Sequence, residues 1–265
     1  MTELSAEAAL ALATDAAREA GALLLELRRL PATGVRSKSS ATDLVSEADE
    51  RAERAIIARI QRRRPDDALI AEEGSESPGS SGISWYIDPL DGTINYLYGI
   101  PHWSVAICCA DPAGPLAGVV FDPVRVELFA ATRGDGARLN DRSLAVTDKR
   151  ELASALVATG FGYVAQQRET QGRILASVLG DIRDVRRFGS AALDLSWVAA
   201  GRYDGYFESV DKPWDWMAGA LLVREAGGCV TQLTPSDPAL PRIIASGPGM
   251  HDDLVALLAR ATEGL

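Results

Sequence analysis

The hydrophobic positions near the start of the chain recur at helical spacing. Residues 5–29 are rich in Ala and Leu with acids and arginines at intervals, and Pro31 follows. Residues 43–64 repeat apolar side chains every three or four positions, and Pro65 comes next. Because proline cannot continue a helix and an apolar stripe buries one helix face, the pattern predicts two amphipathic helices.

From residue 68 the helical period gives way to short apolar runs. The first run covers residues 68–71, and a stretch rich in Ser, Gly and Pro without core-forming residues follows it at 74–82. That composition predicts an exposed, mobile loop. Four strand candidates come next and end at turns around Gly134 and Asn140; they are residues 83–88, 103–110, 116–122 and 126–132. The first half of the chain is therefore expected to be α+β.

After about residue 147 the pattern changes to strands that alternate with helices. The strand candidates are residues 155–159, 184–187, 203–208 and 243–245, and the helix candidates are 166–179, 191–200, 214–226 and 252–261. Such alternation is typical of helices packed on a sheet and predicts an α/β half. We expect two halves, 1–147 and 148–265, with no Gly-rich linker between them.

The composition adds limits on partners and location. The 265 residues are 47% hydrophobic, enough for a substantial core, and the formal net charge is -10. Because a sequence-independent grip on nucleic acid or an anionic membrane needs clustered Lys and Arg, we expect neither partner. The first seven residues carry acids where a leader has basic residues, and no apolar run approaches the roughly 20 residues that span a bilayer. A cytoplasmic location is expected.

The cysteines and histidines do not form a recognisable catalytic motif. Cys108, Cys109 and Cys229 are the only cysteines, and the first two are adjacent in a predicted strand. We interpret all three as reduced, buried thiols. His102 and His251 are the only histidines, and neither stands with a serine or cysteine in a nucleophile motif. His102 is expected to be a packing or rim residue.

Candidate chemistry lies in four acids at the predicted ends of strands and the start of a helix: Glu72, Asp88, Asp91 and Asp215. Each has an ordinary explanation alone, since Glu72 could be a solvated surface residue, Asp88 part of a turn and Asp215 a helix N-cap. Together, unneutralised carboxylates at ligand distances would repel by about 4 kcal/mol per close pair at an effective dielectric near 20. Such a cluster needs cations, and Mg²⁺ prefers oxygen ligands of this kind.

Gly92 and Thr93 follow Asp91 and have a separate predicted task. Glycine lets the backbone turn closely, and amide N–H groups at a following helix start point toward a phosphate. The Thr93 hydroxyl is able to orient a water molecule, and Asp49 on the second predicted helix could accept a hydrogen bond from it.

At these residues the chain resembles the inositol monophosphatase family of magnesium-dependent, lithium-sensitive phosphatases. The segment from Trp85 to Tyr96 fits the first family signature, and the segment from Trp214 to Gly228 fits most of the second. Further matching segments keep the family's order and cover most of the chain; they are Lys38-Ser39-Ser40, Asp43-Leu44-Val45 with Asp49, Ala71-Glu72-Glu73, Gly189 to Ala192 and Gly205 to Glu208. The resemblance implies a layered αβαβα sandwich, two or three Mg²⁺ ions and a homodimer.

The resemblance also implies a role for individual residues. It gives the first metal to Glu72, Asp88 and the backbone carbonyl of Leu90, and the second metal to Asp88, Asp91 and Asp215. It assigns catalysis to Thr93, Asp49 and Glu72, with Thr93 and Asp49 activating the attacking water. The phosphate would rest on the amides of Gly92 and Thr93. The substrate hydroxyls would meet Asp91, Ala191, Glu208 and Asp215.

The expected activity is hydrolysis of a small polyol phosphate such as myo-inositol 1-phosphate. The same chemistry on histidinol phosphate, fructose 1,6-bisphosphate or NADP is the first alternative, and Glu208 with the neutral stretch 96–98 favours a neutral polyol. A regulatory partner of the transcription machinery is the alternative from another class. Met217 is bulkier than the family's residue, so we expect altered packing there. Lys38 is either a turn residue or part of a mobile active-site loop.

Overall fold

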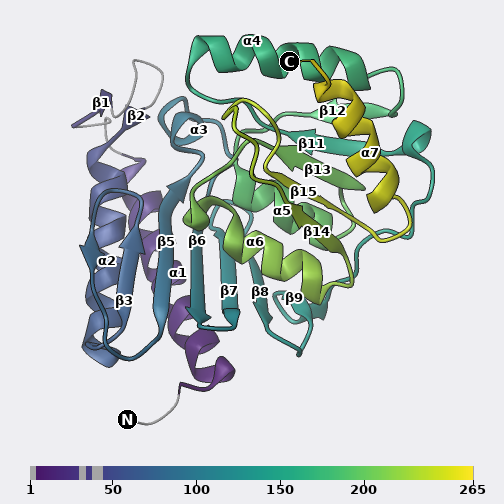
Figure 1. Cartoon of the computed structure of the whole chain (residues 1–265). Helices are drawn as coiled ribbons and strands as arrows, with labels where there is room; N and C mark the ends of the chain where they lie inside the picture. The colour runs from purple at the N-terminus through teal and green to yellow at the C-terminus, as the bar shows by residue number, and fades with distance from the viewer. Residues whose placement is uncertain (1–3, 30–33, 38–43, 265) are drawn as a thin grey trace.

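The computed structural model describes residues 4–29, 34–37 and 44–264, and it shows five alternating layers of helices and sheets (Figure 1). Helices α1 (Ala6–Leu27) and α2 (Glu47–Arg63) cover one face of an eight-stranded sheet. Helices α5 (Ala191–Ala199) and α6 (Pro213–Glu225) lie between that sheet and a five-stranded one. Helices α4 (Ala165–Val178) and α7 (His251–Thr262) form the outer layer. The expected αβαβα sandwich is confirmed.

The eight-stranded sheet belongs to the first half of the chain, in the order β10-β9-β8-β7-β6-β5-β3-β4. Strands β3 and β5 run parallel, so their carboxyl ends lie at the same edge, and the other neighbours are antiparallel. Its strands are β3 (Ala68–Ala71), β4 (Glu76–Ser77), β5 (Ser84–Asp91), β6 (Ser104–Asp111), β7 (Gly114–Asp122), β8 (Glu127–Thr132), β9 (Ala137–Leu139) and β10 (Arg142–Ser143). The two strands β1 (Arg36–Ser37) and β2 (Leu44–Val45) pair separately.

The five-stranded sheet belongs to the second half and has the order β12-β11-β13-β15-β14. Strands β12, β11 and β13 are parallel, whereas β15 is antiparallel to both β13 and β14. Its strands are β11 (Leu156–Thr159), β12 (Asp184–Arg186), β13 (Gly205–Glu208), β14 (Cys229–Gln232) and β15 (Ile243–Ser246). The division of the chain into two domains near residue 147 stays a prediction.

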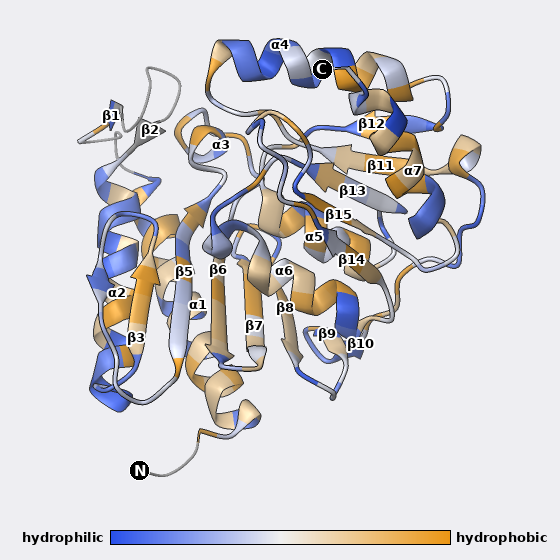
Figure 2. Cartoon of the chain, in the orientation of Figure 1, coloured by the Kyte–Doolittle hydropathy of each residue, from blue (hydrophilic) through white to orange (hydrophobic). Residues whose placement is uncertain are grey.

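The eight-stranded sheet has buried apolar side chains on both of its faces. Strand β6 alternates, so Cys109 packs in the cluster under α1 and α2, while Cys108 packs in the cluster with α5 and α6. Figure 2 shows β6 to β8 in apolar colours, whereas α2 and α4 carry much more blue. The thiols of Cys108 and Cys109 are free and buried as expected, and Cys229 is free but only half-buried.

Helix α2 begins four residues later than predicted because its cap comes from serine. The Ser46 hydroxyl accepts a hydrogen bond from the Ala48 N–H at 3.2 Å, and Asp49 reaches back to the Ser46 N–H at 3.0 Å. This reciprocal capping box fixes the first turn. The helix then ends at Arg63, before Pro65, as the sequence predicts.

Some short elements differ from the sequence prediction. Strand β4 lies inside the predicted loop 74–82, and the N–H groups of Ser80 and Ser81 both donate to the Asp66 carbonyl. Strands β9, β10 and β14 were not predicted. Lys38 and its proposed active-site loop lie outside the described residues. In the described part of the chain, no helix is long and apolar enough to cross a membrane.

Candidate active site

A pocket of about 490 Å³ lies where several elements end or begin. Strands β3, β5 and β13 bring their carboxyl ends to it, and helices α5 and α6 begin beside it. The acidic residues that line the pocket are Glu72, Asp88, Asp91, Glu208, Asp211 and Asp215. The structure therefore brings the four predicted metal-binding acids and the predicted substrate-binding acid to one cavity.

The end of β5 directs two carboxylates to the same side. In a regular strand, residues three positions apart point to opposite faces. The pairing of β5 with β6 shifts register between Asp88 and Asp91, as at a β-bulge. The Leu90 N–H also donates to Oδ1 of Asp88 at 3.0 Å, which fixes this carboxylate over the turn. Both acids consequently reach the pocket.

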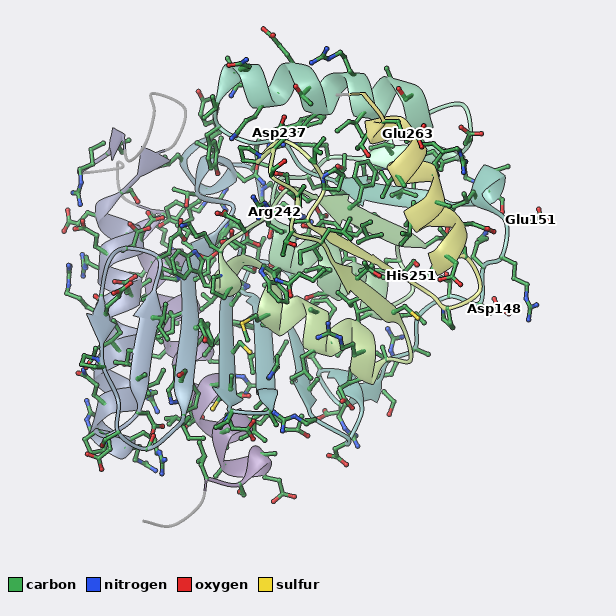
Figure 3. All side chains as sticks on the ribbon, in the orientation of Figure 1. Asp148, Glu151, Asp237, Arg242, His251 and Glu263 are labelled. Atoms are coloured by element: carbon green, nitrogen blue, oxygen red, sulfur yellow. The ribbon has the colours of Figure 1, made fainter. Side chains whose placement is uncertain are left out.

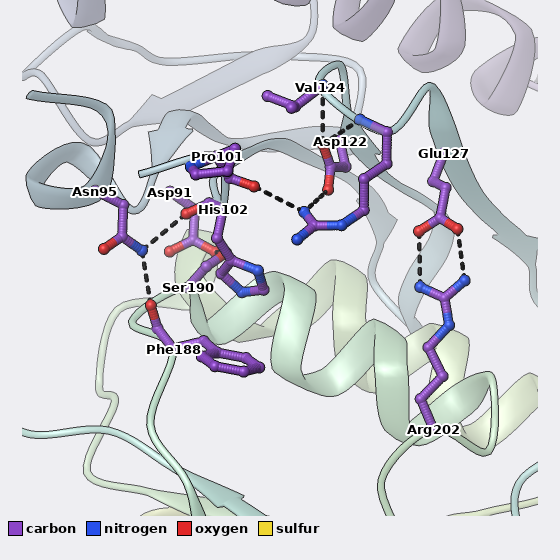
Figure 4. A network of polar contacts seen from close by, with 11 residues as sticks. Asp91, Asn95, Pro101, His102, Asp122, Val124, Glu127, Phe188, Ser190 and Arg202 are labelled. Atoms are coloured by element: carbon purple, nitrogen blue, oxygen red, sulfur yellow. Dashed lines mark hydrogen bonds and ion pairs between the residues drawn. The ribbon is translucent and has the colours of Figure 1, made fainter. Parts of the chain in front are cut away.

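Asp91 connects this turn to helix α5. Its Oδ2 atom accepts hydrogen bonds from the Ser190 hydroxyl at 2.5 Å and from the Ala192 N–H at 2.8 Å. Figure 4 shows Asp91 and Ser190 beside the start of this helix. Asn95 adds a second link, because its side-chain amide donates to the His102 and Phe188 carbonyls. The two halves of the chain are thus held together at the pocket.

The turn after Asp91 needs glycine. Gly92 has φ +90°, and a Cβ atom there would lie 3.1 Å from the His102 carbonyl oxygen. The turn starts the short helix α3 (Thr93–Leu97), whose first residue lines the pocket. The hydroxyl of Thr93 lies 2.9 Å from Oδ1 of Asp49 and 3.0 Å from the Leu90 carbonyl oxygen. The predicted contact between Asp49 and Thr93 is present.

Burial raises the pKa of Asp88, Asp91 and Asp215. The pKa of Asp88 is raised well above its ordinary value, first by burial and then by the charges of Glu72, Asp91 and Asp215. Burial and the neighbouring acids also raise the pKa of Asp215, and burial brings the pKa of Asp91 to about 6 in spite of the Ser190 hydrogen bond. Removal from water together with like charges disfavours the ionised forms.

This donor set suits a hard cation. Carboxylate oxygens and the Leu90 carbonyl are the ligands that Mg²⁺ prefers, and a cation would relieve the mutual repulsion that raises the pKa of Asp88. Hydrogen bonding with the Glu72 side chain is a further cause of the raised pKa of Asp88. Among the described residues, no three His, Cys, Asp or Glu side chains already form a chelating group. The acids therefore fit an ion in chemistry and location, and would have to turn toward it to bind it.

Glu208, at the end of β13, lines the pocket. Its Oε2 atom accepts a hydrogen bond from the Tyr206 hydroxyl at 2.9 Å, and burial raises its pKa to about 7. Ala191, at the start of α5, lines the same cavity. Met217 packs instead against the apolar cluster between the sheets, so the bulkier side chain affects packing there.

Several residues at this site were not identified from the sequence. Ser190 lies in a segment that matches the family pattern, and its place beside Ala191 was a usable signal. The basic residues Arg187, Lys212 and Arg242 also line the pocket, although they share no motif. Figure 3 shows Arg242 toward the centre of the view, away from the outer edge where Glu151 is found. His102 is a packing residue, with its ring 5.1 Å from Phe188 and 5.3 Å from Trp197.

Comparisons with known proteins agree with this geometry. Residues 5–263 match the model of the inositol monophosphatase family. The Nus factor SuhB of Xylella fastidiosa is 44% identical over 88% of this chain and 84% of its own length. The extragenic suppressor protein suhB of Bartonella henselae is 37% identical with a TM-score of 0.88, covering 97% and 100% of the two chains. The inositol monophosphatase of Anabaena is 37% identical with a TM-score of 0.82, covering 96% of each chain.

These relatives correct one expectation. The net charge of -10 led to the expectation of no nucleic-acid partner. Relatives named Nus factor SuhB, the name of a transcription-machinery partner, contradict it, including the one from Escherichia coli strain K12 at 43% identity over 84% of each chain. A summed charge describes the whole surface and says little about a protein that joins a nucleic-acid complex through local contacts.

Proposed function

The chain belongs to the inositol monophosphatase family, and from that premise we propose that it is a Mg²⁺-dependent phosphomonoesterase that hydrolyses a small polyol phosphate, with myo-inositol 1-phosphate as the first candidate. The observation that carries this proposal is the cluster of Glu72, Asp88, Asp91 and Asp215 around one pocket, beside the hydrogen-bonded pair of Asp49 and Thr93. Acids of this kind, next to a group able to orient water, suit metal-assisted phosphate hydrolysis.

The acids would divide between two ions. Glu72, Asp88 and the Leu90 carbonyl would hold one, and Asp88, Asp91 and Asp215 the other, with a third ion allowed by the family pattern. Bound Mg²⁺ would supply positive charge that polarises the phosphate and lowers the pKa of water. The hydrogen bonds from Ser190 and Ala192 would keep Asp91 oriented toward its ion.

Thr93 and Asp49 would prepare the attacking water. A threonine hydroxyl has one proton, so donating it to Asp49 leaves the lone pairs of Thr93 to accept a hydrogen bond from water. Asp49 is fully buried, and burial raises its pKa, which makes its carboxylate a better proton acceptor than an exposed one. Ser46 holds this carboxylate with two hydrogen bonds.

Residues on the other side of the cavity would bind the leaving alcohol. Asp91, Asp215 and the backbone at Ala191 would meet the hydroxyl groups of this alcohol. The phosphate itself would rest on the amides of Gly92 and Thr93. Glu208, with a pKa of about 7, is able to donate or accept a hydrogen bond near neutral pH.

Arg187, Lys212 and Arg242 distinguish between the alternative substrates. Four of the six acids that line the pocket are assigned above to the metal ions, so outside the metal site these three cations stand against Glu208 and Asp211. This small excess of positive charge disfavours histidinol phosphate, whose leaving group carries an ammonium ion. It favours a substrate with a second anionic group, such as fructose 1,6-bisphosphate or NADP, as the alternative to inositol 1-phosphate.

The test is phosphate release with Mg²⁺ from inositol 1-phosphate, histidinol phosphate, fructose 1,6-bisphosphate and NADP, with Asp91→Asn as the blank. Preference for inositol 1-phosphate that is lost in the variant supports the full proposal. Preference for a bisphosphate keeps the chemistry and changes the substrate. Absence of Mg²⁺-dependent release from every compound would refute the enzymatic proposal.

A second function is favoured by the relatives named Nus factor SuhB. We propose that this chain also contacts the transcription machinery. Tagged wild type and Asp88→Asn would each be used to capture proteins from native lysate, and the eluates would be probed for RNA polymerase subunits. Equal recovery by both proteins supports a binding role that is independent of catalysis, and recovery no higher than with an unrelated tagged protein contradicts the role.

Lithium inhibition and a homodimer are also proposed, because the family resemblance implies both. Adding Li⁺ to the phosphate-release assay tests the first. Light scattering on the purified protein gives its mass in solution and tests the second.

A further inference from the structure

Helix α2 buries two carboxylates one helical turn apart. Asp49 is 0% exposed and Glu53 is 2% exposed, although both lie on the side of the helix that carries Ala48, Ala52 and Ile56 into the core. Residues four positions apart share one face of a helix. A buried carboxylate among apolar side chains is unfavourable unless hydrogen bonds compensate for the lost water, so each acid needs partners. Asp49 finds them in Ser46 and Thr93.

Glu53 finds its partners in the backbone just after Glu72. Its Oε2 atom accepts a hydrogen bond from the Glu73 N–H at 2.7 Å, and its Oε1 atom accepts one from the Ser75 N–H at 3.3 Å. Both N–H groups belong to the turn that follows β3. Both carboxylate oxygens are therefore used to hold backbone, about 20 residues away along the chain.

That turn carries Glu72 into the pocket. The Glu72 N–H donates to the Ile87 carbonyl at 3.1 Å, which fixes one side of this residue against β5. The peptide plane on its other side contains the Glu73 N–H, and Glu53 holds that N–H. Because a peptide unit is planar, holding the N–H of Glu73 restricts the ψ angle of Glu72 and hence the direction of its side chain.

We propose that Glu53 is a positioning residue that directs the Glu72 carboxylate toward the metal ion of the pocket. This inference rests on the proposed function. Helix α2 then acts as one rigid element with two tasks: Asp49 sets the Thr93 hydroxyl, and Glu53, one turn later, sets the ligand-bearing turn after β3. Partners that orient a metal ligand change metal affinity about 10- to 100-fold when they are removed.

The chain offers a matched control for a purely structural effect. Asp67 is also 2% exposed and lies just before β3, at the opposite end of this strand from Glu72. It accepts hydrogen bonds from the Trp85 indole N–H at 2.9 Å and the Ser81 hydroxyl at 2.7 Å, and forms an ion pair with Arg64. Asp67→Asn therefore weakens a buried carboxylate that holds the same strands but does not border the pocket.

The experiment compares wild type, Glu53→Gln and Asp67→Asn. Glutamine keeps the size of the side chain but turns one oxygen into an NH₂ group that faces an N–H donor. Binding of Mn²⁺ alone, followed by the electron paramagnetic resonance signal of the free ion, measures metal affinity without relying on activity. Phosphate release against Mg²⁺ concentration gives the half-saturation point and kcat, and calorimetry gives the melting temperature.

We expect Glu53→Gln to raise the Kd for Mn²⁺ about tenfold or more and to shift the Mg²⁺ half-saturation point in parallel, with kcat at saturating Mg²⁺ changed less than about threefold. Asp67→Asn is expected to lower the melting temperature without changing either metal constant. If Glu53→Gln does not fold, Glu53→Asp carries the same test, since it withdraws the carboxylate by one methylene group.

Two results would overturn the inference, and they differ in what else they affect. In the first, wild type binds Mn²⁺ and releases phosphate, and the Glu53 variant binds Mn²⁺ as tightly as wild type or as tightly as Asp67→Asn. This result refutes only the role of Glu53 and leaves the proposed function standing. Wild type that neither binds Mn²⁺ nor releases phosphate refutes the proposed function and this inference with it.

Discussion

The position of the Glu208 carboxylate depends on the absence of a side chain at Gly160. Gly160 follows β11, which pairs with β13, and a Cβ atom at Gly160 would overlap the Glu208 carboxylate. Gly160→Ala therefore forces Glu208 away from the Tyr206 hydroxyl and out of its place in the pocket. We expect KM for the polyol phosphate to rise about tenfold, the loss of one hydrogen bond to a charged group, with little change in kcat.

Steady-state kinetics on the Gly160 variant check this expectation. Gly172→Ala on α4 is the control, because a Cβ atom there meets nothing within 4 Å and alanine favours a helix. An unchanged KM in Gly160→Ala would show that Glu208 does not contact the substrate.

Asp49 is the residue at which loss of charge should affect chemistry most. Asp49→Asn keeps the shape of the side chain but removes the carboxylate that receives the Thr93 proton. General base catalysis contributes about 10²- to 10⁴-fold, so kcat is expected to fall at least about 100-fold. Mn²⁺ affinity should stay close to that of wild type, since Asp49 is not among the proposed ligands. A variant with wild-type kcat would exclude Asp49 from the proton transfer.

Individual residues of the site were predictable to different degrees. Asp88 and Asp91 stand in a signature long enough to identify, and Asp215 stands in a second one. Glu53 was missed, although an acid on the apolar stripe of α2, four residues after Asp49, is a readable signal of a buried partner. Arg242 reaches the pocket from a loop, and its place depends on tertiary structure that no local pattern encodes.

At the scale of elements, α6 connects the pocket with the far edge of the first sheet. It begins near Asp215 and ends at Glu225, whose carboxylate accepts hydrogen bonds from the Gly134 and Gly136 N–H groups at 2.8 and 2.9 Å. Glu225→Ala leaves these two donors without their partner. Water can reach the exposed Gly134 N–H, so we expect the free energy of unfolding to fall by about 0.5–1.5 kcal/mol while kcat is unchanged.

Urea denaturation followed by tryptophan fluorescence measures this change. Glu169→Ala on α4 serves as the control, because Glu169 is an exposed acid on a helix surface, where substitutions usually cost less than about 0.5 kcal/mol. Equal stability of the two variants would contradict a structural role for Glu225.

Elements with a clear apolar pattern were predictable, and short ones were not. The unbroken apolar run of β6 and the apolar stripe of α2 locate these elements to within a few residues. Strands β4 and β10 have two residues each, too few to show a period, and exist because a neighbouring strand offers backbone partners. The start of α2 was misplaced because the serine cap, and not the apolar pattern, decides where it begins.

At the scale of the whole molecule, the five layers exist because the apolar faces of the sheets must be buried by helices. The first sheet is apolar on both sides, so it needs helices from both halves of the chain. The sequence predicted the elements of each half, but the insertion of α5 and α6 between the sheets was implied only by the family resemblance. Nearly all of α5 is buried, so its own pattern gives no single inner face. The expectation of no nucleic-acid partner was wrong for a related reason: the net charge does not say where on the surface the charged residues lie.

The pH dependence of stability is also a property of the whole molecule. For an acid whose pKa is raised by folding, the folded state binds more protons than the unfolded state, so its contribution to stability is lost as the pH rises through the folded pKa. The pKa of Glu208 is raised to about 7, and those of Asp88 and Asp215 are raised well above their ordinary values, in each case mainly by burial. His102 acts oppositely, because burial lowers its pKa to about 4, but its stabilising contribution is complete above about pH 6.5.

Among these groups, only the acids with raised pKa values therefore change the stability between about pH 6.5 and 8. One unit of pKa shift corresponds to about 1.4 kcal/mol. In the presence of a chelator we expect the melting temperature to fall by about 5 °C over this range, since 1 kcal/mol shifts it by about 2–4 °C in a chain of this size. Millimolar Mg²⁺ binds the ionised acids, so it should reverse the fall and stabilise more at higher pH. Asp215→Asn removes one acid with a raised pKa and one metal ligand. Its melting temperature should therefore fall less with pH, and Mg²⁺ should raise that temperature less than in wild type. A metal-free melting temperature that rises with pH in this window would mean that the acids are ionised and paired in the folded state, and the carboxylate cluster would then need no cation to hold it together.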